Sequence, residues 1–316
     1  MKCRICGNEK ENQTYEAREM MFGYKDVFRY FQCSKCKCLQ IEEFPSNMSK
    51  YYPDTYYSYQ TISSRNKIKK FLSGLRDKYA LSGKGLIGKL LYAKYPRENL
   101  RSLSFLPVSK DTSILDVGCG GGALLYSLRE IGMKNLLGVD PFIAKDIEYE
   151  NGLRIKKKEI HDVEGKYDIV MFHHSFEHTS DPAKTLETAS RLLTTNGYCV
   201  IRIPIASSYA WEHYRVNWVQ LDAPRHLFLH SVESMNILAD QAELDLCKVV
   251  YDSTSFQFWG SEQYINEIPL TDKRSYAQNP KTSIFPKREI STFAKRAKEL
   301  NEREQGDQAI FYLKRS

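Results

Sequence analysis

The sequence predicts an α/β fold in which a mainly parallel sheet is covered by helices on both faces. From residue 113 onward, short apolar runs alternate with helix-like segments, which is the order expected of strands joined by crossover helices. A glycine-rich turn, VGCGGG, follows the first apolar run and opens a helix. Hydrophobic residues make up 42% of the 316-residue chain, which is enough for a real core and excludes global disorder.

Each element is predicted from its own local signal. Strands are predicted at 113–117, 135–140, 153–160, 167–172, 197–204, 244–253 and 308–315. Helices are predicted at 122–132, 181–193 and 231–243. The first helix stops at Gly132, the second has an acidic start with a proline in its first turn, and the third begins with a serine cap. The segment 62–106 is predicted to form helices that break at Gly74 and at SGKG, 82–85.

The chain divides into three predicted parts. Residues 1–45 form a small module with β-like runs, and residues 46–107 form a tyrosine-rich, helical and basic linker. Residues 108–316 form the main domain, with a lid insertion around 256–306.

Positive charge is concentrated near the N-terminus. The first 107 residues hold 20 Lys and Arg against 10 Asp and Glu, whereas the remainder holds 26 against 29. This excess favours an anionic partner, such as a nucleotide diphosphate, a nucleic acid or an anionic lipid surface; a solvated helical face is the alternative. Because no apolar run approaches a membrane span and the N-terminus lacks the pattern of a signal peptide, we expect a cytoplasmic protein.

Two cysteine pairs near the N-terminus predict a metal site. Cys3 and Cys6 form one C-x-x-C pair, and Cys33 and Cys36 form a second, with 26 residues between the two pairs. Two such pairs in a reducing compartment are typical of a tetrahedral zinc site. Four thiolates leave no open coordination position, so we expect a structural zinc ribbon, with Cys38 as a spare or alternative ligand.

The glycine-rich turn and two carboxylates predict a nucleotide-like cofactor. Gly118, Gly120 and Gly122 allow the backbone to come close to a ligand at the end of the first strand. Asp140 ends the next strand, where a carboxylate accepts hydrogen bonds from ribose hydroxyls. Asp116 precedes the first glycine by two residues, where it would repel a pyrophosphate but attract a ligand with ammonium and sulfonium groups.

These motifs resemble those of class I S-adenosylmethionine-dependent methyltransferases. The resemblance is carried by ILDVGCGGG, LLGVDP, YDIVMFHHSFEHTSDP and LLTTNGYCVIRIP within residues 113–204, and by QAIFYLKR as a reversed last strand. It implies a Rossmann-like sheet, with S-adenosylmethionine as the cofactor. It also implies the cofactor-binding residues: Asp116, Gly118, Cys119 and Gly120 at the methionine end, Asp140 and Pro141 at the ribose, and Glu159 or Ile160 at the adenine. Because His173 and His174 directly follow the fourth strand, we expect one of them to approach the sulfonium, and His173 is assigned to the cofactor.

The histidine cluster HHSFEH, 173–178, predicts the catalytic end of the site. Histidine is suited to remove a proton from a poor nucleophile near neutral pH. Glu177 and His178 resemble the Glu-His pair of sugar methyltransferases that carry an N-terminal zinc module, which implies that His178 is the base and Glu177 orients it or binds substrate. His174 is assigned to the substrate side.

A second cluster, PRH at 224–226, resembles a segment near the acceptor pocket of the same group. It makes His226 the alternative base and Arg225 a candidate clamp for a phosphate or carboxylate. The alternative for Arg225 is a loop arginine that hydrogen-bonds carbonyl groups. The tyrosine-rich segment of those enzymes also implies a substrate role for Tyr56 and Tyr57, near Tyr51 and Tyr52.

Together these features predict a methyltransferase whose acceptor is a small molecule, most simply an anionic sugar derivative such as a nucleotide-linked or glycan-precursor sugar. O- and C-methylation both stay open. One alternative is an RNA methyltransferase that uses its basic N-terminal region to bind RNA. A second alternative is a non-catalytic zinc-ribbon subunit that binds a partner.

Overall fold

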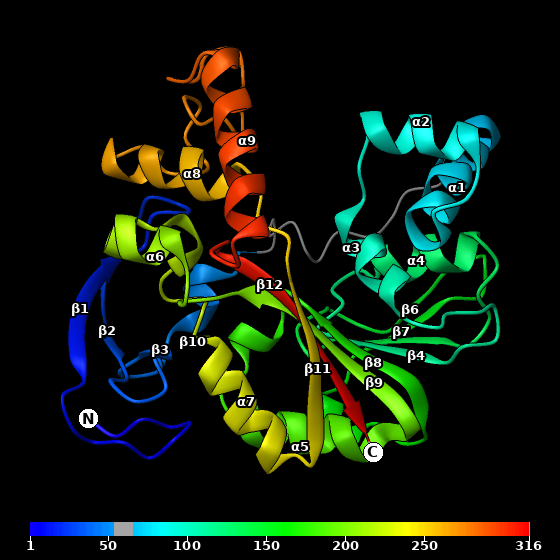
Figure 1. Ribbon diagram of the computed structural model, residues 1–316, viewed down its shortest axis with the longest axis horizontal. Helices are drawn as coiled ribbons and strands as arrows, with labels where there is room; N and C mark the ends of the chain where they lie inside the picture. The colour runs from blue at the N-terminus through cyan, green and yellow to red at the C-terminus, as the bar shows by residue number, and fades with distance from the viewer. Residues whose placement is uncertain (54–65, 316) are drawn as a thin grey trace.

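An eight-stranded sheet forms the centre of the protein. The computed structural model describes residues 1–53 and 66–315. The strands are β4 (Ile114–Val117), β5 (Leu136–Val139), β6 (Ile147–Glu148), β7 (Arg154–Lys156), β8 (Tyr167–His173), β9 (Leu193–Pro204), β11 (Leu244–Tyr251) and β12 (Gln308–Arg315), in the order β11-β12-β9-β8-β4-β5-β7-β6 (Figure 1). Strands β7, β5, β4, β8 and β9 are parallel, whereas β12 is antiparallel to both β9 and β11. The predicted mainly parallel sheet with a reversed last strand is confirmed.

Helices cover both faces of this sheet because its buried strands alternate their side chains between two cores. In β8, Ile169 and Met171 contribute to one core, while Val170 and Phe172 contribute to the other. The first core is covered by α1 (Lys67–Ser82), α3 (Glu98–Arg101) and α4 (Ala123–Glu130). The second is covered by α5 (Pro182–Leu192) and α7 (Val232–Gln241).

The helix start signals read from the sequence are confirmed, but one predicted break is wrong. The side chain of Asp181 accepts a hydrogen bond from the Lys184 amide at the start of α5, and Ser231 caps α7. Helix α1, by contrast, runs straight through Gly74 and ends before Gly83, which adopts φ 68°. A single glycine costs a helix only about 1 kcal/mol, too little to end one whose flanking residues favour helix.

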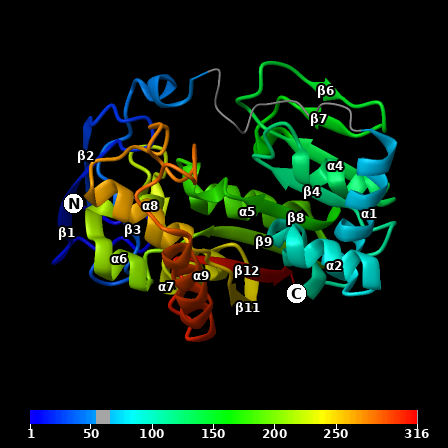
Figure 2. The same cartoon turned by 90° about the horizontal axis from the view of Figure 1, so that it is seen from above.

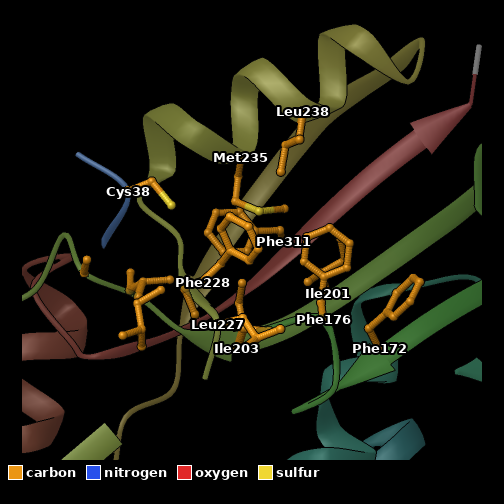
Figure 3. Packing of buried hydrophobic residues seen from close by; sticks show 14 of the residues in the cluster. Cys38, Phe172, Phe176, Ile201, Ile203, Leu227, Phe228, Met235, Leu238 and Phe311 are labelled. Atoms are coloured by element: carbon orange, nitrogen blue, oxygen red, sulfur yellow. The ribbon is translucent and has the colours of Figure 1, made fainter. Parts of the chain in front are cut away.

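The N-terminal module is joined to the main domain by a shared sheet. Strands β1 (Gln13–Arg18), β2 (Val27–Gln32) and β3 (Leu39–Ile41) are completed by β10 (Phe228–Leu229), in which Phe228 pairs with Gln40. The cores are also continuous: Figure 3 shows Cys38, Phe228 and Phe176 beneath the α7 residues Met235 and Leu238. A boundary at residue 45 therefore separates two sequence regions but not two packing units, and the division into three domains stays a prediction.

The remaining helices lie at the two ends of the molecule. At one end, α6 (Tyr209–Tyr214), α8 (Phe256–Ile265) and α9 (Lys287–Glu302) gather beside the N-terminal sheet, and Phe258 stacks on Phe293 at 5.3 Å. At the other end, α2 (Leu86–Lys94) packs against α1 (Figure 2). Short 3-10 helices lie at Met48–Tyr51, Ser102–Phe105, Ile160–Asp162, Phe176–His178, Arg215–Asn217 and Val219–Leu221. Among residues 1–53 and 66–315, no helix combines the length and apolar character needed to cross a membrane.

Candidate active site

A cavity of about 720 Å³ opens at the carboxyl ends of β4, β5 and β8. One end, here called the donor end, is lined by Gly118, Asp140, Pro141, Glu159 and Ile160. The other, here called the acceptor end, is lined by His174, His178, Asp222 and His226. Segment 254–278 covers the acceptor end with Thr254, Phe256, Leu270, Thr271 and Gln278, where the lid was predicted.

The donor end is built on backbone geometry that requires glycine. Gly118 has φ 70°, and a Cβ at this position would lie 2.4 Å from the Cβ of Ser175, in the loop after β8. The Ser175 hydroxyl donates a hydrogen bond of 2.6 Å to the carbonyl of Val117. The glycine turn and the histidine loop are therefore packed directly on each other.

Asp140 is fixed in place by two backbone amides. Its Oδ2 accepts a 2.8 Å hydrogen bond from the Gly120 amide, and its Oδ1 accepts a 2.8 Å bond from the Phe142 amide. A carboxylate held in this way at the end of a parallel strand, on the wall of a cavity, fits the ribose position predicted for it.

Asp116 is buried behind the cavity wall rather than on it. Its Oδ1 has no hydrogen-bond partner within the described part of the chain, and burial together with nearby Asp140 raises its pKa well above the usual range. Cys119 and Gly120 likewise lie outside the cavity lining. An unpartnered buried carboxyl group beside the glycine turn suits a ligand that brings a cationic group to this end, as S-adenosylmethionine would.

The structure does not bring the His173 side chain to the cavity. Strand alternation places Phe172 on the cavity wall and turns His173 toward the opposite face, where its Nε2 lies 3.4 Å from the Ser102 hydroxyl. Its neighbour His174 adopts φ 54°, an unusual conformation for a histidine, and lines the cavity instead. Of the two histidines predicted for the sulfonium side, only His174 is placed to serve the site.

His178 has the proton arrangement of a base. Its Nδ1 lies 2.8 Å from the carbonyl oxygen of Arg225, and because a carbonyl only accepts, Nδ1 carries the hydrogen. The Tyr52 hydroxyl lies 3.2 Å from the same nitrogen. The unprotonated nitrogen of neutral His178 is therefore Nε2. Burial lowers the pKa of His178 below 6.5, although the neighbouring Glu177 carboxylate opposes this shift.

Glu177 is a fully buried carboxylate surrounded by imidazoles. His174 Nδ1 lies 3.4 Å from its Oε1 and His226 Nε2 lies 3.9 Å from the same atom, while His178 completes the group. Neither carboxylate oxygen has a well-formed hydrogen bond within the described residues. Burial opposes ionisation, but the imidazoles outweigh it and lower the pKa of Glu177 to about 2. The negative charge of Glu177 therefore lies where it would stabilise a neighbouring imidazole that becomes protonated.

His226 and His174 are each oriented by a second contact. His226 Nδ1 lies 2.8 Å from the carbonyl oxygen of Gln220, which leaves its Nε2 facing Glu177 and Asp222. Arg202 Nη1 donates a 2.6 Å hydrogen bond to His174 Nε2. Arg202 in turn pairs with Asp252 at 2.6 Å, so it spans from β9 to the end of β11.

Arg225 does not line the cavity, and its predicted role as a clamp stays a prediction that its contacts do not favour. The side chain is fully buried and makes a two-pronged contact with Asp222, with Nη2–Oδ1 at 2.6 Å and Nε–Oδ2 at 2.9 Å. Nη2 also donates to Glu19 at 3.0 Å, and the guanidinium lies 5.2 Å from the Phe22 ring. Its donors are therefore occupied by contacts that join the N-terminal module to the acceptor end.

The four predicted zinc ligands come together. The sulfur atoms of Cys3, Cys6, Cys33 and Cys36 all lie within 4.8 Å of one another, with Cys3–Cys36 at 3.6 Å and Cys6–Cys33 at 3.5 Å. These separations match the edge of about 3.8 Å expected for a tetrahedron with Zn–S bonds of about 2.3 Å. Gln40 Nε2 donates a 3.2 Å hydrogen bond to the Cys3 sulfur, as expected around a thiolate.

Cys38 lies outside this quartet and is not a spare ligand. Its sulfur packs 4.0 Å from His230 Nδ1, in the core shared with α7.

Tyr56 and Tyr57 lie outside the described residues. Asp222, Gln220 and Arg202 are the site residues that sequence reasoning missed; a charged residue in an apolar strand, IRIP, was the only signal for Arg202.

Comparisons with known proteins agree with this geometry. A family model described as a methyltransferase domain matches residues 91–249, about half of the chain. Ubiquinone biosynthesis O-methyltransferase of Colwellia psychrerythraea is 36% identical over 98 residues, which cover 28% of this chain and 39% of that protein. tRNA U34 carboxymethyltransferase of Helicobacter acinonychis is 29% identical over 112 residues, covering 31% of this chain and 43% of that protein.

The chain thus spans about two fifths of the length of these curated relatives. Among solved structures, the cyclopropane synthase MmaA2 of Mycobacterium tuberculosis aligns with 80% of this chain and 100% of its own, at 13% identity and a TM-score of 0.45.

Proposed function

The chain belongs to the methyltransferase-domain family, in the S-adenosylmethionine-dependent class that its motifs predicted, and from that premise we propose that it methylates a small, hydroxyl-rich acceptor such as a sugar. One observation carries this proposal: a single cavity joins the donor end, with Gly118 and Asp140, to the acceptor end, with His178 and His226. Its volume of about 720 Å³ lies within the range of small-molecule sites.

The donor end supplies binding and alignment. Asp140, fixed by two amides, receives the ribose hydroxyls, and the wall formed by Glu159 and Ile160 flanks the adenine. Bound S-adenosylmethionine supplies a methyl group already activated on a sulfonium. The remaining barrier lies in aligning the acceptor and removing its proton.

We assign proton removal to Nε2 of His178. The Arg225 carbonyl fixes the hydrogen on Nδ1, and the lowered pKa of His178 keeps the imidazole neutral at pH 7. When Nε2 takes the acceptor proton, the imidazolium that forms lies beside the ionised Glu177, which stabilises it. His226 has the same tautomer and contacts the same carboxylate, and it remains the alternative base.

Besides its histidines, Asp222 and the paired Arg202, the acceptor end is lined by neutral hydrogen-bonding groups. These are Thr179, Gln220, Thr254, Thr271 and Gln278. Such groups suit a polyol, either a sugar hydroxyl for O-transfer or the carbon beside a keto group for C-transfer. Because Arg225 is already engaged, an anionic part of the acceptor requires another basic group; Lys158 also lines the cavity, next to the donor-end residue Glu159.

We propose a structural role for zinc in this reaction. The four thiolates leave no open position for substrate, and the module they hold contributes Glu19, which pairs with Arg225 beneath the acceptor end. The zinc ribbon therefore braces the acceptor end and takes no part in the chemistry.

A two-stage experiment tests the function. Calorimetry first measures binding of S-adenosylhomocysteine, and transfer of a tritiated methyl group is then screened over nucleotide sugars, glycan precursors and bulk RNA. We expect donor binding and label in a sugar fraction that Asp140→Ala abolishes and Asp146→Ala, at an exposed carboxylate, preserves. Donor binding with label in RNA alone would contradict the proposal and assign the protein to the class of its tRNA-modifying relative.

A further inference from the structure

The α1–α2 hairpin exposes an apolar surface that no described part of the chain covers. On α1, Ile68 and Phe71 are 70% and 66% exposed, and Leu72 beside them is also exposed. On α2, Leu86 and Leu90 are 82% and 73% exposed, with Ile87 between them. Large apolar residues exposed to this degree at neighbouring positions mark an interaction surface in soluble domains.

The spacing gathers these residues on one face of each helix. Positions 71 and 72 follow position 68 by three and four residues, and position 90 follows positions 87 and 86 by three and four. Gly88 lies on the opposite side of α2, where a Cβ would come within 2.5 Å of the Leu75 carbonyl of α1. The close approach at Gly88 therefore joins the two helices and turns the apolar residues of α2 away from α1.

Positive charge surrounds this surface. Residues 66–97 contain nine Lys and Arg and a single acidic residue, Asp77, which is buried against Arg76. Lys69, Lys78, Lys84, Lys89 and Lys94 are all exposed. Lys70 pairs with Glu130, so it is partly neutralised.

From this combination we propose that the α1–α2 hairpin is a docking surface for an anionic membrane. Apolar side chains enter the acyl boundary and surrounding lysines contact the headgroups, which is the pattern of interfacial helices. A nucleic acid would use the lysines but leave the six apolar side chains in water. A protein partner would not require an excess of eight positive charges over negative ones.

The position of the hairpin suits this role. The hairpin stands at the end of the molecule away from the N-terminal sheet in both views (Figures 1 and 2). The cavity lies between the two ends, at the carboxyl edge of the sheet. Membrane docking through the hairpin would therefore leave the zinc module and the lid free.

Vesicle co-sedimentation of the full-length protein tests the proposal. We expect binding to vesicles of equimolar phosphatidylglycerol and phosphatidylcholine, and at least about tenfold weaker binding to pure phosphatidylcholine. Leu86→Gln with Leu90→Gln should weaken binding at least about tenfold, because two inserted side chains are lost. Lys84→Glu with Lys89→Glu should have a comparable effect.

Matched controls separate this surface from general charge and hydrophobicity. Lys295→Glu with Lys298→Glu changes the net charge equally on α9, and Ile265→Gln removes an exposed apolar residue of α8. Neither should change vesicle binding. Equal binding by the Leu86/Leu90 variant would overturn the proposal.

Two further outcomes would also overturn it. One is self-association that the Leu86/Leu90 variant abolishes, with no vesicle binding. The other is salt-sensitive binding of bulk RNA that this variant retains. S-adenosylhomocysteine binding, measured in parallel, keeps a failure here distinct from failure of the proposed methyl transfer.

Discussion

The two ends of the cavity are built in different ways. The donor end comes from β4, β5, β7 and the segments after them, within residues 114–160, and backbone amides fix its key carboxylate, Asp140. The acceptor end combines the loop after β8 with residues 219–226 and the lid, and it is braced by Glu19 of the N-terminal module.

This difference assigns separate roles to the two ends. The donor end is local and depends on backbone geometry, so it suits a cofactor that stays the same whatever the acceptor. The acceptor end depends on contacts between residues that are far apart in the chain, so changes far from the cavity alter it. Perturbations of the zinc module should therefore affect the acceptor end and spare the donor end.

Loss of zinc should produce the largest effect. Cys33→Ser removes a ligand, and because a structural zinc site contributes about 10 kcal/mol or more to folding, the N-terminal module should lose its structure. Hydrogen exchange should show lost protection in β10 and residues 219–226, with protection kept in β4 and β5. Elemental analysis should find one zinc per wild-type chain and none in Cys33→Ser.

Cys247→Ser provides the control for zinc loss. Cys247 is exposed and lies outside the sulfur quartet, so this variant should keep its metal and its protection. Equal loss of protection in β4 and β5 of Cys33→Ser would show that the two ends do not differ.

Arg225→Met should produce the next largest effect. It leaves Glu19 and Asp222 unpaired in a buried site, so the free energy of unfolding should fall by about 3–5 kcal/mol in urea titrations. Methyl transfer should fall as well, because Oδ2 of Asp222 lies 3.8 Å from Nε2 of His226. Arg274→Met breaks an exposed pair with Asp272 and should leave stability nearly unchanged; similar losses in both variants would contradict the account.

Asp140→Asn should affect the donor end alone. An amide cannot accept both backbone N–H groups and the ribose hydroxyls as a carboxylate does, so S-adenosylhomocysteine should bind about tenfold to a hundredfold more weakly. Calorimetry measures this directly, with Asp146→Asn as the control. Unchanged affinity would remove Asp140 from the donor site.

His230 should make the smallest contribution, visible as pH dependence. Burial lowers its pKa from 6.5 to about 3, so below pH 6.5 the unfolded chain takes up a proton that the folded protein does not. Stability is therefore full above pH 6.5 and falls in acid, with His230 accounting for about 2 kcal/mol between pH 7 and pH 5. Between pH 7 and pH 5, the free energy of unfolding of His230→Phe should fall by about 2 kcal/mol less than that of the wild type. Identical pH profiles of the two proteins would refute this assignment.

The sequence predicted the donor end better than the acceptor end for a physical reason. Glycines at fixed spacing and Asp140 are needed by a backbone turn that spans neighbouring strands, so the signal lies within a few dozen residues. The strands themselves were equally predictable from periodicity, and the sulfur quartet from its spacing.

The acceptor end depended on contacts that no local pattern contains. The role of Arg225 is decided by Glu19, 206 residues away, and β10 exists only because β3 offers an edge to pair with. His173 and His174 are adjacent in sequence, yet a change of backbone conformation at His174 sends their side chains to different places. The sequence named a cluster that lines the cavity, but it could not predict where each side chain of that cluster lies.

The most direct test of the central claim is the single-turnover rate of methyl transfer by His178→Gln, with the donor bound and the acceptor identified by the tritium screen. Glutamine keeps a hydrogen-bond donor for the Arg225 carbonyl but provides no base. We predict a rate about a hundredfold or more below that of the wild type, with unchanged affinity for S-adenosylhomocysteine. A rate within about threefold of the wild type would contradict the assignment of the base to His178.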